Sequence, residues 1–274
     1  MTTLSILCLS VGASIGILGF IVAYYIQMKR LHTQSQNFLR SPVMVKGLVS
    51  SSTIGANDTV YDIGAGSGII TSALAPVAKK VIAVEYDQRI AQTLKTNTAQ
   101  FSNVEVRMGD FLNLPLPKTA YKIFANPPFH ISSAIVRRCI NPGGGALAPE
   151  AMYLIVQRQF GKKLIATDTS HFTGQLGMIV GVEYKVKILK NLQKTDFWPH
   201  PAVDTVFVEF LRRKEPLVAK DRLAAYIRYT EECFSDPKKL NKLPLHLIGG
   251  EKGMSPSRLS LERWVLLFNS QKVY

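Results

Sequence analysis

A glycine-rich turn between an apolar run and a helical stretch limits the fold of this chain more than any other feature. Residues 58–63 read Asp-Thr-Val-Tyr-Asp-Ile, glycines occupy every second position from Gly64 to Gly68, and residues 69–77 have a helical pattern. Glycines at alternate positions let a ligand approach the backbone and expose the amides that begin the helix. The segment therefore predicts a strand, a ligand-binding turn and a helix, as in a parallel α/β sheet.

Acidic residues lie at the ends of the first three predicted strands. Glu85 closes the second apolar run, 21 residues (85 − 64) beyond Gly64, where an acidic side chain can bind ribose hydroxyls. Asp62 is the next-to-last residue of the first predicted strand, and Asp110 lies two residues after the third predicted strand. Because open α/β sheets bind ligands at the carboxyl ends of their strands, these groups predict one nucleoside pocket. A dinucleotide site stays open, although its usual spacing is G-x-G-x-x-G and this turn is G-x-G-x-G.

A fourth run, residues 121–125, leads into Asn126-Pro127-Pro128-Phe129. The Asn126 oxygen and the Pro127 carbonyl could accept the two N–H bonds of an amine attached to a planar ring. Phe129 would offer a stacking face, and the two prolines hold a stiff turn without amide donors. Four such residues alone would favour a strand followed by a rigid loop. Together with the upstream glycine turn and acidic groups, they indicate an aminomethyltransferase.

In this order, the motifs resemble those of class I S-adenosylmethionine-dependent methyltransferases. More narrowly, the chain resembles the rRNA adenine N6-methyltransferase family, which comprises the erythromycin-resistance (Erm) enzymes and the small-subunit dimethyladenosine transferases. The narrower resemblance rests on five segments: 35–39 (Ser-Gln-Asn-Phe-Leu), 110–112 (Asp-Phe-Leu), 116–117 (Leu-Pro), 156–160 (Val-Gln-Arg-Gln-Phe) and 197–204 (Phe-Trp-Pro-His-Pro-Ala-Val-Asp). Residues 211–217 and 233–235 look closer to Erm.

The resemblance implies transfer of a methyl group from S-adenosylmethionine to adenine N6 of an rRNA, with 23S rRNA favoured over 16S. Phe38 and Phe129 would stack on the adenine, and Asn126, Pro127 and Phe129 would be catalytic. No metal is expected. The cofactor residues would be Gln36, Asn37, Asp62, Gly64, Gly66, Gly68, Glu85, Asp110 and Asn126.

One departure from the family pattern keeps other functions open. The family usually has Asn-(Ile/Leu)-Pro-(Tyr/Phe), whereas residues 126–129 contain a double proline. That pair is closer to methyltransferases of DNA adenine or of protein glutamine amides. A non-catalytic nucleic-acid-binding relative is the third alternative, which the intact glycine turn and Asn126 argue against.

The alternation of apolar and helical segments predicts an α/β fold. The Rossmann-like seven-stranded sheet would carry an antiparallel edge pair near 176–188 and 204–211. Helices are expected from Ser41-Pro42 and, beyond the sheet, near 221–234 and 256–268. Further strands are expected near 59–63, 81–85, 104–108, 121–125 and 151–157. The domains would be 1–27, 28–214 for the methyltransferase and 215–274 for a basic, helical, RNA-binding unit.

The N-terminus predicts a membrane helix. Residues 4–26 are 23 uncharged residues (26 − 4 + 1), or roughly 34 Å of helix, against a bilayer core of about 30 Å. Lys29 and Arg30 follow, which would leave the catalytic domain in the cytoplasm. Alternatively, Met28 is the true start and begins a complete family N-terminus.

Net charge and cysteine content indicate which binding partners and covalent or metal links to expect. The net charge of +14 and a pI of about 9.7 favour a polyanionic partner such as RNA, and a bacterial membrane surface would be attracted too. Three cysteines are scattered singly, which indicates neither a disulfide framework nor a zinc site. We expect a monomer.

Overall fold

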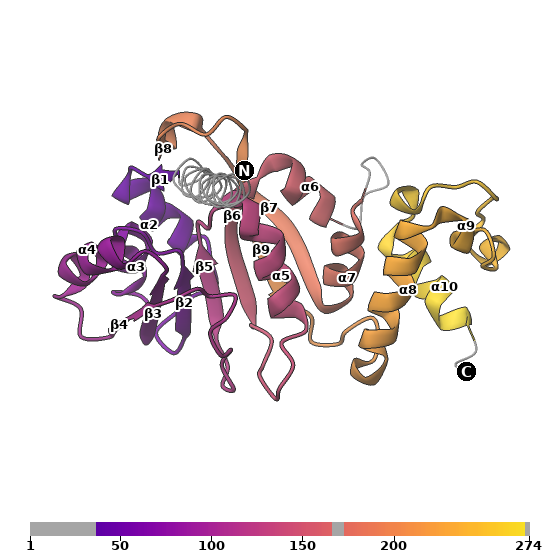
Figure 1. Ribbon diagram of the computed structural model, residues 1–274, viewed down its shortest axis with the longest axis horizontal. Coiled ribbons are helices and arrows are strands. Elements are labelled where there is room, and N and C mark those ends of the chain that lie inside the picture. Colours follow the sequence, from indigo (N-terminus) through magenta and orange to yellow (C-terminus); the bar gives the residue numbers. More distant parts are fainter. Residues whose placement is uncertain (1–36, 166–172, 272–274) are drawn as a thin grey trace, which may run out of the picture. The chain divides into compact units, whose positions relative to one another are not determined.

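A seven-stranded mixed sheet with helices on both faces forms the centre of the molecule (Figure 1). The structure, a computed structural model, describes residues 37–165 and 173–271. Across the sheet the strand order is β4-β3-β2-β5-β6-β9-β7. The strands are β2 (Thr59–Ile63), β3 (Lys80–Glu85), β4 (Val104–Met108), β5 (Lys122–Ala125), β6 (Ala151–Gln157), β7 (Tyr184–Leu192) and β9 (Thr205–Arg212).

The direction of the strands places a ligand crevice at one edge of the sheet. Strands β2 to β6 pair in parallel, whereas β9 is antiparallel to both β6 and β7. The chain moves outward from β2 to β4 and then returns to β5 beside β2, so the order reverses between β2 and β5. Ligands bind at such a reversal, outside the carboxyl ends of the strands. The five predicted parallel strands and the antiparallel pair are confirmed.

Three helices cover each face of the sheet. Helices α2 (Pro42–Ser50), α3 (Ile69–Leu74) and α4 (Gln88–Thr98) pack on one face, and α5 (Ser132–Ile140), α6 (Arg158–Leu164) and α7 (Gln175–Glu183) pack on the other. Ser41 caps α2 as predicted, because its hydroxyl accepts a hydrogen bond from the Met44 amide at 3.2 Å.

The strand predicted near 176–188 is wrong in its first half, because residues 175–183 form α7 and β7 begins only at Tyr184. Every residue from Leu176 to Glu183 is buried. Ile179 packs on the sheet core, while Met178 packs on the C-terminal helices. A helix buried on all sides shows no polar stripe, so its apolar run reads like a buried strand.

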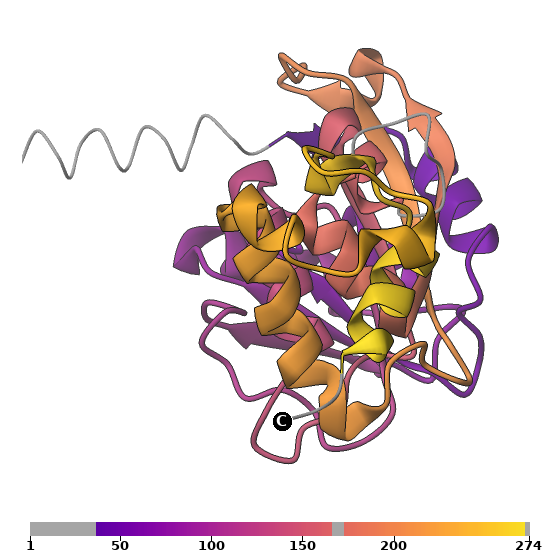
Figure 2. The ribbon, with the colours of Figure 1, turned by 90° about the vertical axis from the view of Figure 1, so that its right-hand side faces the viewer.

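The C-terminal residues form a small helical unit (Figure 2). Its core includes Met178 and Val182 of α7. Its helices are α8 (Leu223–Ser235), α9 (Pro237–Leu240) and α10 (Leu261–Ser270). The ring of Trp264 is fully buried, and Tyr226 contacts Phe268 edge-on at 5.2 Å between centroids. Two helices were predicted here. The second begins later than expected, since residues 256–258 form a separate 3-10 turn.

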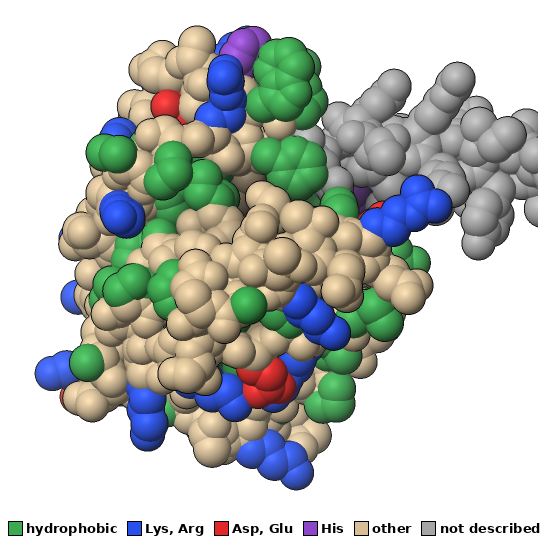
Figure 3. Space-filling model, turned by 90° about the vertical axis from the view of Figure 1, so that its left-hand side faces the viewer, with side chains coloured by type: hydrophobic (Ala, Val, Ile, Leu, Met, Phe, Trp, Pro, Cys, Tyr) green, Lys and Arg blue, Asp and Glu red, His purple; other side chains and the backbone are tan. Residues whose placement is uncertain are grey.

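A separate two-stranded sheet joins the start of the described chain to the segment between β7 and β9. Strand β1 (Phe38–Leu39) pairs antiparallel with β8 (Phe197–Trp198). In the view of Figure 3, large hydrophobic side chains gather near the top of the molecule. The pairing of β1 with β8 was not predicted.

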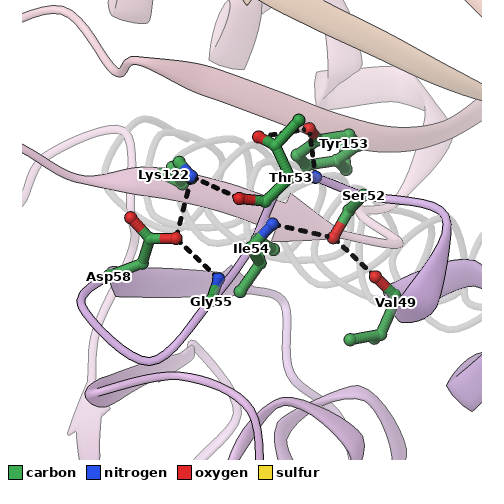
Figure 4. A network of polar contacts seen from close by, with 8 residues as sticks. All are labelled: Val49, Ser52, Thr53, Ile54, Gly55, Asp58, Lys122 and Tyr153. Carbon is green, nitrogen blue, oxygen red and sulfur yellow. Dashed lines mark hydrogen bonds and ion pairs between the residues drawn. The ribbon is translucent and has the colours of Figure 1, made fainter.

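Polar contacts fasten the opposite edge of the sheet, away from the crevice (Figure 4). The Lys122 ammonium donates to the Thr53 carbonyl at 2.6 Å and to Asp58 Oδ2 at 2.8 Å. The Gly55 amide donates to the same carboxylate at 2.7 Å, and the Tyr153 hydroxyl contacts Thr53 on both its amide and its hydroxyl. The side chains of Lys122 and Asp58 are only 12% and 18% exposed.

We expect Lys122→Met to lower the free energy of unfolding by about 2–4 kcal/mol, because a partly buried carboxylate and a carbonyl lose their cationic partner. Urea denaturation would measure this loss. The matched control is Lys187→Met, which removes an exposed lysine of the edge strand β7. A loss no larger than that of the control would show that the ion pair contributes nothing.

Residues 4–26, predicted as a membrane helix, and the alternative start at Met28 lie outside the described residues. Within residues 37–165 and 173–271, the helices are too short or too polar to cross a bilayer.

Candidate functional site

Four strand ends bring the predicted site residues to one edge of the sheet. Ile63 at the end of β2 pairs with Val84, and the Gly64 amide donates to the Val84 carbonyl at 2.9 Å. On the other side, the Gly109 amide donates to the Glu85 carbonyl at 2.9 Å. One crevice is therefore lined by the glycine turn after β2, by Glu85 at the end of β3 and by Asp110 after β4.

The glycine turn has a conformation that side chains rarely allow. Gly64, Gly66 and Gly68 have φ angles of 69°, 58° and 96°. A Cβ atom on Gly64 would lie 3.5 Å from Cδ of Pro128, and one on Gly66 would lie 3.3 Å from the Phe38 ring. Alternate glycines thus let the turn pack closely against the Pro-Pro segment and the Phe38 ring.

Glu85 holds this turn in place from the neighbouring strand. Its Oε2 accepts a hydrogen bond from the Gly66 amide at 2.9 Å, and its Oε1 accepts one from the Asp87 amide at 3.0 Å. The residue is only 4% exposed. Each carboxylate oxygen accepts more than one hydrogen bond. Glu85 can therefore support the turn and still accept from ribose hydroxyls.

Asp62 is a fully buried carboxylate with one unused oxygen. Its Oδ2 accepts a hydrogen bond from the Thr71 hydroxyl at 2.6 Å, whereas Oδ1 has no partner within the described part of the chain. Burial, opposed by the Thr71 hydrogen bond and reinforced by the negative charge of Glu85, raises the pKa of Asp62 from 3.8 to about 7. A cationic or N–H-bearing ligand would stabilise the ionised form.

This raised pKa predicts a change of stability with pH. The folded chain holds the Asp62 proton between about pH 4 and pH 7, whereas the unfolded chain releases it, so rising pH lowers the contribution of this group to stability. Asp62→Asn keeps an acceptor for Thr71 and cannot ionise. The free energy of unfolding of the variant minus that of the wild type should therefore grow by about 2–4 kcal/mol from pH 4 to 7 and stay level above.

Urea denaturation from pH 4 to 8.5, in the absence of ligands, would measure this difference. The control is Asp204→Asn, whose side chain is 62% exposed, and its difference should stay within about 0.5 kcal/mol throughout. A difference for Asp62→Asn that does not vary with pH would contradict the raised pKa.

Asp110 shapes the loop after β4. Its Oδ1 accepts a hydrogen bond from the Leu112 amide at 2.9 Å, and its Oδ2 accepts one from the Asn113 side chain at 2.8 Å. The residue is half-buried. These contacts fix the direction of the carboxylate and leave lone pairs that can accept from a nucleobase amine.

The side chain of Asn126 is oriented by a contact with the start of the described chain. Its Nδ2 donates to the Asn37 carbonyl at 2.7 Å. Because a carbonyl only accepts, this contact fixes which end of the amide is the oxygen. No donor from the described residues reaches the Asn126 oxygen, and none reaches the Pro127 carbonyl. Two acceptors in this loop are therefore available to a bound amine.

The two predicted stacking residues belong to separate elements, the 3-10 turn η1 (Phe129–Ile131) and β1. Phe129 begins η1 and is half-buried, whereas Phe38 is 38% exposed and lies against Gly66. Gln36 lies outside the described residues.

Two residues in contact with the site were missed by the sequence analysis. Thr71 binds Asp62, and the only signal for it is a hydroxyl in the first turn of the predicted helix. Trp198 lies opposite Phe38 in the β1–β8 pair. The only sequence signal for a role at the site is its position between Phe197 and Pro199 in the 197–204 segment.

Comparisons with known proteins agree on the family. A family model described as "Ribosomal RNA adenine dimethylase" matches residues 28–247. A ribosomal RNA small subunit methyltransferase A from Latilactobacillus sakei is 30% identical over 213 residues, covering 74% of this chain and 71% of the relative. An rRNA adenine N-6-methyltransferase from Lysinibacillus sphaericus is 26% identical and covers 88% of this chain and 96% of the relative.

Among solved structures, the 23S rRNA methyltransferase ErmE superposes with a TM-score of 0.73 at 26% identity, over 85% of this chain and 98% of that one. The match confirms the Rossmann-like fold of class I methyltransferases. The chain belongs to the ribosomal RNA adenine dimethylase family and is an S-adenosylmethionine-dependent rRNA adenine N6-methyltransferase.

Proposed function

We propose that this enzyme methylates N6 of an adenine in the peptidyl-transferase loop of 23S rRNA. The observation that carries the chemistry is the Asn126 amide, which the Asn37 carbonyl holds with its oxygen free to accept. The Pro127 carbonyl next to it supplies the second acceptor. Two fixed acceptors match the two N–H bonds of an adenine amine.

The residues of the crevice fit S-adenosylmethionine. Within the described residues, Oδ1 of Asp62 is a buried acceptor without a partner. The positive φ angles at Gly64, Gly66 and Gly68 favour glycine, so these positions carry no Cβ atom that would block a ligand. When bound, the cofactor supplies an electrophilic methyl group on a sulfonium. Glu85 would accept from the ribose hydroxyls and Asp110 from the adenine amine of the cofactor, with Gln36 and Asn37 covering the site.

The chain's own residues would act mainly by position. An aromatic amine is a poor nucleophile, because its lone pair is delocalised into the ring. Acceptors at Asn126 and Pro127 favour a pyramidal nitrogen whose lone pair points at the methyl group, and they stabilise the positive charge that develops there. Phe129, with Phe38, would stack on the adenine once it has left its base stack. The reaction then needs no strongly basic side chain.

Other parts of the chain would hold the RNA. We propose that residues 28–214 are the methyltransferase domain and residues 215–274 a helical RNA-binding domain, acting as a monomer. Lysines 238, 239 and 242 lie in and after α9 on that unit. With a net charge of +14, binding should weaken steeply as salt rises, because phosphate contacts release counterions.

The choice of 23S rRNA is supported by residues 211–217, which look closer to Erm, and by the similarity to ErmE over nearly its whole length. A second candidate, an adenine near the 3′ end of 16S rRNA, is favoured by the similarity to small-subunit methyltransferases. Methylation of the 23S adenine removes a donor and adds bulk where macrolides bind, so it would confer macrolide, lincosamide and streptogramin B resistance.

Primer extension on both rRNAs decides between them. The full chain, and the chain from Met28, would each be expressed in a susceptible host, with Asn126→Ala as the inactive control. We expect a stop in the peptidyl-transferase loop together with joint resistance to the three drug classes. Modification confined to the 16S 3′ end would refute the 23S assignment. Transfer in vitro only to DNA adenine or a glutamine peptide would refute both.

A further inference from the structure

Trp198 is a large aromatic residue that takes no part in the core or in the chemistry described above. It is 63% exposed, although it lies in β8, within the arm of residues 193–204 that connects β7 to β9. Tryptophan is enriched where proteins bind partners, because its ring supplies a large apolar face at little conformational cost. Its exposure here therefore points to a ligand.

The backbone of the arm is fixed by contacts on both sides of Trp198. The Arg40 amide donates to the Asp196 carbonyl at 3.0 Å, which ties the arm to the residues after β1. Lys194 donates through Nζ to the Ala202 carbonyl at 3.2 Å, and its own carbonyl lies 2.8 Å from His200 Nδ1. The Trp198 ring therefore projects from a loop whose backbone is held by these hydrogen bonds.

The pairing of β1 with β8 places two exposed aromatic residues opposite each other. Phe38 lies directly opposite Trp198, and Leu39 lies opposite Phe197. Residues directly opposite in an antiparallel pair project from the same face, with Cβ atoms about 5 Å apart. Leu39 and Phe197 are buried on one face, whereas Phe38 and Trp198 are exposed on the other. The exposed face is an aromatic shelf made by Phe38 and Trp198.

This shelf is continuous with the methyl-transfer site. Phe38 lies against Gly66 of the glycine turn, and the carbonyl of the preceding residue, Asn37, holds the Asn126 amide. Trp198 extends the shelf one strand further from Asn126. A base stacked on Trp198 would therefore neighbour an adenine held at Asn126.

Extrusion of an adenine leaves its neighbours without a stacking partner. An aromatic side chain can replace that partner for any base, since every base has a π face. We propose that Trp198, beside Phe38, stacks on an unpaired rRNA base next to the target adenine and so positions the substrate. This proposal rests on the proposed rRNA adenine methylation and adds a binding subsite to it.

Intrinsic fluorescence tests the stacking directly. The chain has two tryptophans, and Trp264 is fully buried, so the solvent-exposed emission comes from Trp198. A single-stranded oligoribonucleotide should quench this emission. An abasic oligonucleotide of the same length and charge should bind through its phosphates with little quenching. Trp198→Phe supplies the blank, in which the base-dependent quenching is lost.

Kinetics test the positioning role. With an in vitro transcript of the 23S peptidyl-transferase region or of the 16S 3′ end, whichever the enzyme methylates, Trp198→Ala should raise KM for RNA about ten-fold. Trp198→Phe should stay within about three-fold, because the ring is retained. Calorimetry should give the wild-type Kd for S-adenosylmethionine in both variants. Val77→Ala, an exposed apolar residue just before β3 at the opposite edge of the sheet, should change none of these values.

The outcomes separate the subsite from the enzyme activity. Equal quenching by the abasic strand, or an unchanged KM for Trp198→Ala, would overturn the stacking proposal while methylation by the wild type still supported the proposed function. Quenching without methylation of either rRNA would overturn both the activity and the positioning role. If Trp198→Ala fails to fold, the difference in quenching between the two oligonucleotides still tests the stacking, with Trp198→Phe as the blank.

Discussion

Asn126→Ala should lower kcat for methyl transfer by at least about 10²-fold while the Kd for S-adenosylmethionine stays within a few-fold of the wild-type value. The reason is the proposed role of the Asn126 oxygen, which the contact of Nδ2 with the Asn37 carbonyl orients and which would accept from the substrate amine. Removing one fixed polar group that stabilises developing charge typically costs 10²–10³-fold in rate, so an effect of this order is expected. Single-turnover kinetics with labelled cofactor and calorimetry would measure the two quantities separately.

Asn103→Ala is the matched control. The Asn103 amide also donates to backbone carbonyls, those of Ala75 and Ala78 at 2.8 and 2.9 Å, but it does so before β4, at the far edge of the sheet. It should lower stability and leave the rate per folded molecule unchanged. Substantial turnover by Asn126→Ala, or an equal loss in both variants, would remove Asn126 from the catalytic site.

The second large effect is expected at Glu85. Glu85→Gln removes the negative charge and turns an N–H group toward a backbone amide, either of Gly66 or of Asp87, which now donate to the carboxylate. Losing a charged acceptor of this kind costs about 1–3 kcal/mol, so the Kd for S-adenosylmethionine should rise roughly 5- to 150-fold. Isothermal calorimetry would measure it.

Glu105→Gln provides the comparison on the adjacent strand. Glu105 pairs with Lys80 and Arg107 on the surface, with a side chain 39% exposed, and it lies away from the strand end. Its replacement should leave the affinity for the cofactor unchanged. The role of Glu85 would be rejected if both variants bound the cofactor like the wild type.

The sequence predicted the parallel strands well because β2, β3, β5 and β6 are short, mainly apolar runs and β4 alternates apolar with charged residues. β2, β4 and β6 begin and end at the predicted residues, and α2 begins where Ser41 and Pro42 predict. These signals are local, since they depend on residues that are neighbours in the chain.

Contacts between distant segments could not be predicted in the same way. The Asn126 amide binds a residue 89 positions earlier, and β1 and β8 are only two residues each, too short to show any alternation. α7 was mistaken for a strand because packing on two sides removes the polar face by which a helix is recognised. The predicted strand order was enough to bring Glu85, Asp110 and Asn126 to one edge of the sheet. The hydrogen-bond partners of these side chains could be identified only from the structure.

The double burial of α7 constrains where a chimaera of two relatives could be joined. Met178 and Val182 are covered by C-terminal residues such as Leu223 and Trp264, so cutting the chain near 215 would strip an apolar helix face that water cannot solvate well. A chimaera that grafts another relative's C-terminal helices must therefore bring a complementary surface for these two side chains. A breakpoint before α7 makes the same demand on its other side, because Leu176 and Ile179 pack on the sheet core and strands β7 and β9 follow α7 in the chain. Recombination between relatives is therefore costly on either side of α7.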